Sequence, residues 1–192
     1  MTYRVMTVCT GNICRSPMAE IVLRARFAAA GLGDEVVVDS SGTSDEERGN
    51  PVDARARRVL VAHGYPAGDG HRARRVRSDD LATHDLVLAM TAAHARTLRR
   101  LLRSTEPEVA VGIPTNTDHN LRFDDASVSG GPVVMLRRFD PGAPVVTDPR
   151  EEHRLDIDDP WYGGPDDFEA CLAQIEAAAD GVVAHVRAAL GR

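Results

Sequence analysis

The 192-residue sequence contains no lysine, so all 23 of its basic residues are arginine. Together with the abundant alanine, this absence indicates a GC-rich coding sequence and carries no functional meaning. Aromatic residues form only 4% of the chain, and there are three cysteines. Three cysteines do not make a disulfide framework, which favours a reducing compartment, so we expect a cytoplasmic protein.

Long apolar runs are also missing, since none approaches the ~20 residues that a membrane-spanning helix needs. Residues 1–4 lead directly into a strand pattern, so we expect no signal peptide and no membrane association. The formal net charge of −6 argues against a nucleic-acid partner, because such a partner requires a basic face. Nothing in the chain resembles a clustered His/Asp metal site, and we expect neither a metal nor a cofactor.

One stretch near the start is informative. Residues 8–20 follow the pattern of an apolar strand, a tight turn, and a helix with Ser16 as its N-cap. Cys9 opens the turn and Arg15 closes it. The intervening Gly11 and Asn12 accept the left-handed backbone angles that a loop of converging amides requires. Such a loop, joined to the positive end of a helix, favours a bound phosphate and the thiolate form of a cysteine.

The run Cys-Thr-Gly-Asn-Ile-Cys-Arg-Ser-Pro at residues 9–17 resembles the signature loop of the low-molecular-weight protein tyrosine phosphatases. That family also has a late Asp-Pro-aromatic segment, and residues 159–163, Asp-Pro-Trp-Tyr-Gly, match it. The likeness extends in order over residues 4–103 and 132–190. Residues 104–131 have no counterpart, and we expect a loop or disordered insert there within a single phosphatase domain, 1–192.

Strand patterns alternate with helix patterns along the chain, which predicts an α/β fold with a parallel sheet. The strands are expected at residues 4–8, 36–38, 86–90 and 133–136. The resemblance implies a flavodoxin-like three-layer sandwich with four strands in the order 2-1-3-4 and a phosphate-binding loop after strand 1. Because ligands bind at the carboxyl ends of such strands, the topology brings the late Asp-Pro segment to the side of Cys9.

This arrangement suits the hydrolysis of phosphate monoesters through a phosphocysteine. Cys9 would be the nucleophile, Arg15 would bind the phosphoryl group, and Asp159 would act as general acid and base. Asp158 is the competing carboxylate, but the family pattern puts the acid directly before the proline. The phosphate would be bound by the rest of the loop: Thr10, Gly11, Asn12, Ile13, Cys14 and Ser16.

The Ser16 hydroxyl can also stabilise the Cys9 sulfur as it leaves phosphorus. The resemblance implies a network of Asn12, Ser16, Ser40 and His71 that holds the loop in shape. For Cys14 two readings stay open, a small filler or a partner that traps oxidised Cys9 as a reversible disulfide. Cys171 lies in the apolar pattern of the last helix and is expected in the core.

Four functions are compared. The arsenate reductases that share this loop need further cysteines near the third strand, and residues 80–95 contain none. Protein-arginine phosphatases tend to have Thr where this chain has Ile13, whose bulk suits a phenyl ring. A non-enzymatic phosphate-binding module would lack one of the three catalytic candidates. Phosphotyrosine in proteins or peptides is therefore the expected substrate and inorganic phosphate the product, with a monomer as the working form.

The pocket wall is less typical of the family. Glu46 takes the place where relatives offer an aromatic side chain, which leaves Trp161 and Tyr162 as the aromatic wall and predicts a different peptide preference. The insert should emerge at the amino end of the sheet, away from the site. The arginines at 72, 74, 75 and 77 are expected to be a solvated loop face.

Overall fold

The computed structural model describes residues 2–104 and 132–192. Its centre is a four-stranded parallel sheet with the order β2-β1-β3-β4, which confirms the predicted topology. The strands are β1 (Tyr3–Cys9), β2 (Val36–Gly42), β3 (Leu86–Ala89) and β4 (Val133–Met135). Both faces of β1 and β3 are buried, which explains why these strands show apolar runs and not an alternation of apolar and polar residues.

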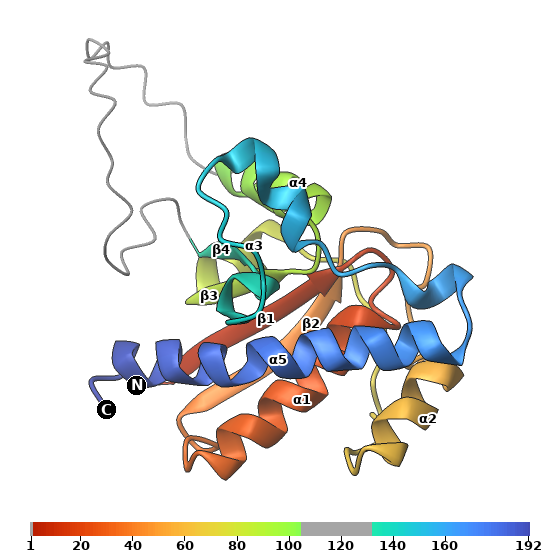
Figure 1. Cartoon of the computed structure of the whole chain (residues 1–192). Coiled ribbons are helices and arrows are strands. Elements are labelled where there is room, and N and C mark those ends of the chain that lie inside the picture. Colours follow the sequence, from red (N-terminus) through yellow and green to blue (C-terminus); the bar gives the residue numbers. More distant parts are fainter. Residues whose placement is uncertain (1, 105–131) are drawn as a thin grey trace, which may run out of the picture.

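Helices cover both faces of the sheet and make three layers (Figure 1). One face carries α1 (Arg15–Ala29), α2 (Ala54–Ala62) and α5 (Pro165–Ala189). The other carries α3 (Ser78–Thr83) and α4 (Ala92–Arg103). Neighbouring residues of a strand serve different layers: Val5 packs with the α1 and α5 side, and Met6 packs with the α3 and α4 side.

The start of α1 differs from the prediction. The helix begins at Arg15 with Cys14 as its N-cap, and no side chain caps it. Ser16 is therefore inside the first turn and not at the cap. Its hydroxyl bonds to residues of the loop before the helix, and these bonds outweigh the general preference for serine at a helix cap.

The segment between β4 and α5 crosses the carboxyl edge of the sheet and brings residues 156–162 to the end of β1. It contains three short 3-10 helices, Leu136–Phe139, Pro149–Leu155 and Pro160–Tyr162. The expected insert at 104–131 and its placement lie outside the described residues, apart from Ser104. In the ranges that the structure describes, no helix is both long enough and apolar enough to cross a membrane.

Candidate active site

The loop between β1 and α1 has one residue in the left-handed region. Asn12 has a φ of 58° and is the only non-glycine residue with a positive φ among residues 2–104 and 132–192. The end of β2 approaches this loop closely, because a Cβ on Gly42 would lie 2.4 Å from the carbonyl oxygen of Thr10. Only glycine fits there, so the last residue of β2 and the loop are matched to each other.

The carbonyl groups of this loop point outward and bond to neighbouring segments. The bonds are Thr43 N to Cys9 O (2.9 Å), Ser44 N to Thr10 O (3.0 Å), His71 Nε2 to Asn12 O (2.8 Å) and Asp53 N to Ile13 O (2.8 Å). The N–H and C=O of a planar trans peptide point in opposite directions. The amides that follow these carbonyls therefore face the inside of the loop, where they and the N-terminus of α1 favour an anion.

The side chain of Asn12 holds the loop from within. Its Nδ2 donates to Ser16 Oγ at 3.0 Å and to Ser40 Oγ at 2.8 Å, and its Oδ1 accepts from the backbone N of Arg74 at 3.0 Å. Ser40 Oγ in turn donates to Glu20 Oε2 at 2.5 Å. Both donor hydrogens and the oxygen of this fully buried amide thus have partners, which stabilises the left-handed conformation of Asn12.

Cys9 lies at the bottom of this loop. Its Sγ accepts a hydrogen bond from the backbone N of Asn12 at 3.3 Å and lies 3.0 Å from Ser16 Oγ. Since Ser16 Oγ already accepts from Asn12, its own hydrogen is available either to the sulfur or to Ser41 O, 3.2 Å away. A negative charge on Sγ would draw that hydrogen toward the sulfur, so the site can stabilise a thiolate.

Arg15 is 4% exposed and faces the same space. Its Nη1 donates to Ile157 O at 3.1 Å, and its Nη2 donates to Asp159 Oδ2. Its Nε is buried and has no partner among the described residues. A buried N–H without a partner is costly, and in this position it can be satisfied by an oxygen of a bound phosphoryl group.

Asp159 precedes the short 3-10 helix at Pro160–Tyr162 and lies at the mouth of the pocket. Its Oδ2 pairs with Arg15, and its Oδ1 accepts from the backbone N of Trp161 at 3.2 Å. Its side chain is 38% exposed. Both oxygens are therefore oriented by the protein, while solvent still reaches the carboxylate. Asp158, the alternative considered from the sequence, is not among the residues that line the pocket.

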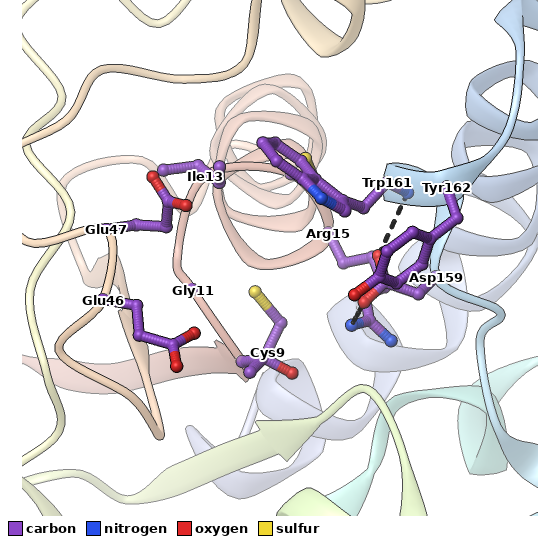
Figure 2. Close-up of a pocket in the computed structure, with 11 residues that line it drawn as sticks. Cys9, Gly11, Ile13, Arg15, Glu46, Glu47, Asp159, Trp161 and Tyr162 are labelled. Carbon is purple, nitrogen blue, oxygen red and sulfur yellow. Dashed lines mark hydrogen bonds and ion pairs between the residues drawn. The ribbon is translucent and has the colours of Figure 1, made fainter.

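A pocket of about 120 Å³ opens above Cys9 (Figure 2). In this view Glu46 and Glu47 lie on one side, while Asp159, Trp161 and Tyr162 lie on the other. The complete lining consists of Cys9, Thr10, Gly11, Ile13, Cys14, Arg15, Glu46, Glu47, Asp159, Trp161 and Tyr162. The structure thus brings together the signature loop, Glu46 and the late Asp-Pro segment. Glu47 was not among the residues predicted from the sequence.

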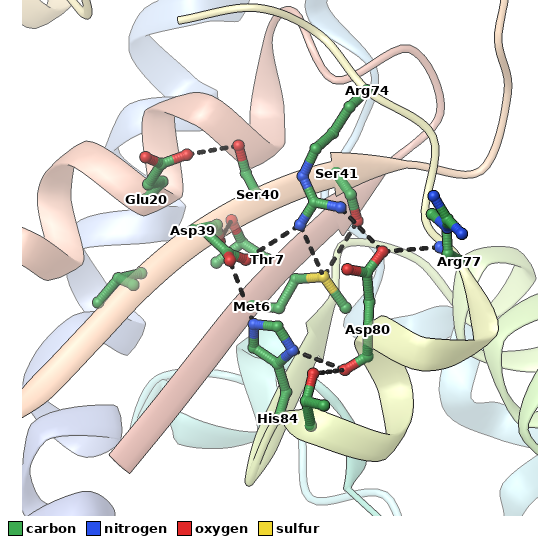
Figure 3. A network of polar contacts seen from close by, with 12 residues as sticks. Met6, Thr7, Glu20, Asp39, Ser40, Ser41, Arg74, Arg77, Asp80 and His84 are labelled. Carbon is green, nitrogen blue, oxygen red and sulfur yellow. Dashed lines mark hydrogen bonds and ion pairs between the residues drawn. The ribbon is translucent and has the colours of Figure 1, made fainter. Parts of the chain in front are cut away.

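Arg74 supports the loop from behind (Figure 3). Its guanidinium donates to Asp80 Oδ2 at 2.8 Å and lies 3.4 Å from Asp39 Oδ1, while its backbone N bonds to Asn12. Its side chain is 37% exposed. The prediction of a purely solvated face was therefore wrong for Arg74, because the carboxylates in the first turn of α3 and in β2 draw its guanidinium toward the sheet.

His84 continues the same network. Its Nδ1 lies 2.6 Å from Asp80 O and its Nε2 lies 3.2 Å from Asp39 Oδ2. Both neighbours are acceptors, so this arrangement favours an imidazolium with a hydrogen on each nitrogen. Burial alone would lower the pKa of His84, but the bonds to Asp39 and to the Asp80 carbonyl outweigh burial and raise it.

Another histidine contacts the loop from the layer formed by α3 and α4. His94, in the first turn of α4, places Nε2 2.9 Å from Thr10 Oγ1 and Nδ1 2.9 Å from Thr91 Oγ1. Burial, with a smaller effect of the nearby Arg15 charge, lowers the pKa of His94 to about 4. His94 is therefore neutral at physiological pH and joins the loop to α4. The sequence analysis did not predict this contact.

The two remaining cysteines are buried and free. Burial raises the pKa of the Cys14 thiol, and the carboxylate of Asp53 adds to the effect. Burial also raises the pKa of Cys171 to about 12. Cys171 packs in the core on the buried face of α5, which confirms the prediction of a core position. Both are thus thiols at neutral pH. This is compatible with either reading of Cys14, since a protonated thiol can fill space or act as a resolving partner.

Comparison with known proteins agrees with this geometry. Residues 4–125 match the family model described as low molecular weight phosphotyrosine protein phosphatase. A low molecular weight protein-tyrosine-phosphatase of Streptomyces coelicolor is 43% identical over 187 residues, which cover 97% of this chain and 95% of the relative. Low molecular weight protein-tyrosine phosphatase A of Mycobacterium tuberculosis is 41% identical over 175 residues, or 91% of this chain and 86% of the relative.

Among solved structures, the crystal structure of YfkJ from Bacillus subtilis is similar with a TM-score of 0.74 and 26% identity, covering 98% of this chain and 96% of that one. The chain therefore belongs to the low molecular weight phosphotyrosine protein phosphatase family. This membership makes it a phosphoric monoester hydrolase of the protein tyrosine phosphatase type.

Proposed function

We propose that this protein hydrolyses phosphotyrosine in proteins or peptides through a phosphocysteine formed on Cys9. The observation that carries the proposal is the convergence on one small pocket of Cys9 Sγ, a buried Arg15 with an unpartnered Nε, and the Asp159 carboxylate. A nucleophile, a phosphoryl-binding cation and a proton donor are the three groups that this reaction requires.

In the first step the Cys9 thiolate attacks phosphorus and forms a P–S bond while the P–O bond to the tyrosine oxygen breaks. Asp159 in its acid form gives its proton to that oxygen, so tyrosine leaves as a neutral phenol. The inward-facing amides and Arg15 stabilise the charge on the three remaining oxygens. A phosphoryl group on Cys9 can replace Asp159 as the partner of Arg15 Nη2 and satisfy Nε as well.

In the second step Asp159, now a carboxylate, takes a proton from water as that water attacks phosphorus. The P–S bond breaks, inorganic phosphate leaves, and Cys9 returns to the thiolate. Ser16 Oγ, 3.0 Å from Sγ, stabilises the departing sulfur. The cation and the amides supply the electrostatic stabilisation in both steps, so we propose a metal-independent reaction.

The pocket wall supports an aryl phosphate as the substrate. Ile13 is buried and lines the pocket together with Trp161, and apolar walls of this kind suit a flat ring. We further propose that the chain works as a single-domain monomer in the cytoplasm. The catalytic groups Cys9, Arg15 and Asp159 are all supplied within this chain, so no second copy is needed to complete the site. The three free cysteines favour a reducing compartment.

The test compares phosphotyrosine, phosphoserine and phosphoarginine peptides without added metal, in the parent protein and in Cys9→Ser and Asp159→Ala variants. We expect turnover of phosphotyrosine alone, its loss in Cys9→Ser, and a strong reduction in Asp159→Ala. Turnover that survives in Cys9→Ser would contradict the mechanism. A preference for phosphoarginine would contradict the substrate, and would do so without affecting the assignment of the nucleophile.

A further inference from the structure

Two adjacent carboxylates form one side of the pocket mouth. Glu46 is exposed and Glu47 is half-buried, and both follow β2 in the segment that covers the signature loop. Glu47 is fixed there by contact with Gly11, because a Cβ on Gly11 would lie 2.9 Å from Glu47 Cγ. Its Oε2 accepts a hydrogen bond from Asn50 Nδ2 at 2.7 Å. The stem of Glu47 therefore lies on the loop, and its charge is held at the mouth (Figure 2).

Neither carboxylate has an ion-pair partner in the part of the chain that the structure describes. The nearby cations are paired with other groups: Arg15 with Asp159, Arg55 with Asp53, and Arg75 with Asp45. Arg48 is exposed and follows Glu47 directly in the sequence, but it does not line the pocket.

The opposite side of the mouth does not compensate for this charge. Trp161 and Tyr162 are neutral, and the guanidinium of Arg55 stacks on the Trp161 ring at 5.2 Å and donates to Trp161 O at 3.0 Å. Arg55 is thus paired with Asp53 and Trp161, and it does not neutralise Glu46 or Glu47. The mouth as a whole therefore presents two unpaired negative charges directly above a loop that binds an anion.

We propose that Glu46 and Glu47 select phosphotyrosine sites that are flanked by basic side chains and reject sites that are flanked by acidic ones. The inference rests on the proposed function and names its substrate class. The phosphate enters the cationic loop, while the peptide on either side of the tyrosine crosses the mouth. An arginine there gains an ion-pair partner that the free protein lacks, and a glutamate meets like charge.

The size of the effect follows from the exposure of the two groups. An exposed ion pair contributes about 0.2–1 kcal/mol, or roughly 1.4- to 5-fold in an equilibrium constant. Two such pairs, set against two repulsive ones, give a preference in kcat/KM of about fourfold or more. Because exposed charges are screened over about 10 Å at 0.1 M salt, this preference should shrink as salt is added.

The experiment uses three phosphotyrosine peptides of equal length, with arginine, alanine or glutamate at the two positions on each side of the tyrosine. The measured quantity is the ratio of kcat/KM for the arginine peptide to that for the glutamate peptide. Each variant supplies its own ratio, so a general loss of activity cancels. The variants are Glu46→Gln, Glu47→Gln, the double variant and the charge reversal Glu46→Arg.

Asp34→Asn is the matched control. It removes one exposed negative charge between α1 and β2, at the amino edge of the sheet, and should keep the parent ratio. We expect the ratio to fall stepwise toward one in the glutamine variants, and to fall to about one in Glu46→Arg, where the new positive charge offsets the remaining charge of Glu47. A parent ratio near one, or a ratio that the double variant leaves unchanged, would overturn the inference.

An aryl phosphate without a peptide separates this inference from the proposed function. If the aryl phosphate is hydrolysed while the peptide ratio is one, the inference fails and the proposed function stands. If neither the aryl phosphate nor any phosphotyrosine peptide is hydrolysed, the proposed function fails and the inference fails with it.

Discussion

The floor and the mouth of the pocket are built in different ways. On the floor, Asn12 and Ser16 are fully buried and Arg15 is 4% exposed, and their polar atoms are joined by short hydrogen bonds. At the mouth, Trp161 is 39% exposed and Tyr162 is 91% exposed. A buried network that is almost fully satisfied accepts one geometry, whereas exposed groups can change at little cost. The chemistry is therefore fixed at the floor, and selectivity is left to the mouth.

After the loss of activity in Cys9→Ser, the largest effect is expected for Asp159→Asn, which keeps the hydrogen-bonding shape of the side chain but cannot transfer a proton. General acid catalysis is worth about 10²–10⁴-fold, and kcat for an aryl phosphate with a poor leaving group should fall by that order. The fall in kcat/KM, which reports the first step alone, should be smaller when the leaving phenol is more acidic. Asp158→Asn, which changes the neighbouring exposed carboxylate, should leave kcat nearly unchanged, and an equal fall in both variants would contradict the assignment.

The next effect concerns the loop itself. Asn12→Ala removes the bonds to Ser16 and Ser40 and places a less suitable residue at a φ of 58°. We expect kcat/KM to fall by about 10²-fold from misplacement of the loop, and the free energy of unfolding in urea to fall by about 3 kcal/mol.

Asn12→Gly is the matched variant for this position, because it loses the same bonds but accepts the left-handed angle. It should recover about 1 kcal/mol of the stability lost by Asn12→Ala without recovering the activity. If Asn12→Gly were as active as the parent protein, the side-chain bonds of Asn12 would have no role in catalysis.

A smaller effect is expected behind the loop, at His84. The raised pKa of His84 means that its protonated form stabilises the folded protein. This stabilisation is fully present below the usual histidine pKa near 6.5, and it is lost as the pH rises through the folded-state pKa. Burial alone would raise the pKa of Asp39, but the contacts with His84 and Arg74 outweigh burial and lower it. The ionised Asp39 therefore stabilises the folded protein, and this stabilisation is lost only as the pH falls through the lowered pKa.

His84→Gln should therefore lower the stability by about 1–3 kcal/mol near pH 6, through loss of a bond to a charged group. The difference from the parent protein should narrow as the pH is raised above neutrality. Thermal unfolding of the two proteins at several pH values measures the loss of stability near pH 6 and its change with pH. A difference in melting temperature that grew with pH would contradict a protonated His84.

The smallest effect is expected at the mouth. Tyr162→Phe removes only an exposed hydroxyl and should change kcat/KM for a phosphotyrosine peptide by less than about twofold. Trp161→Leu, which shortens the aromatic wall, should raise KM by roughly 3- to 10-fold while kcat stays nearly constant, because uniform binding is lost. A large fall in kcat in either variant would mean that the mouth takes part in the chemical step.

The difference between local contacts and contacts made by the tertiary fold explains what could be predicted from the sequence. The spacing of Cys9 and Arg15 in one turn is local, so the sequence alone indicates the anion-binding loop. The sheet order was correct because alternating strands and helices restrict the topology, and the family resemblance supplied the rest. Asp159 could be assigned to the same edge from that topology.

The residues that could not be predicted are those joined to the loop only by the tertiary fold. His94 contacts Thr10 from another layer, and Arg74 reaches Asn12 and Asp39 from a segment whose composition suggested solvent. Ser16 was predicted as a helix cap, yet its hydroxyl contacts Cys9 and Asn12, and the helix begins two residues earlier than predicted, at Arg15. In each case a buried polar partner outweighed a local preference.

The most direct test of the central claim is to trap the covalent intermediate. Asp159→Asn, mixed with an aryl phosphate whose leaving group needs no acid and then quenched rapidly, should carry one phosphoryl group on Cys9, located by peptide mass spectrometry. The doubly substituted Cys9→Ser, Asp159→Asn protein should carry none. A phosphoryl group on any other residue, or turnover of the aryl phosphate by Cys9→Ser, would contradict the account.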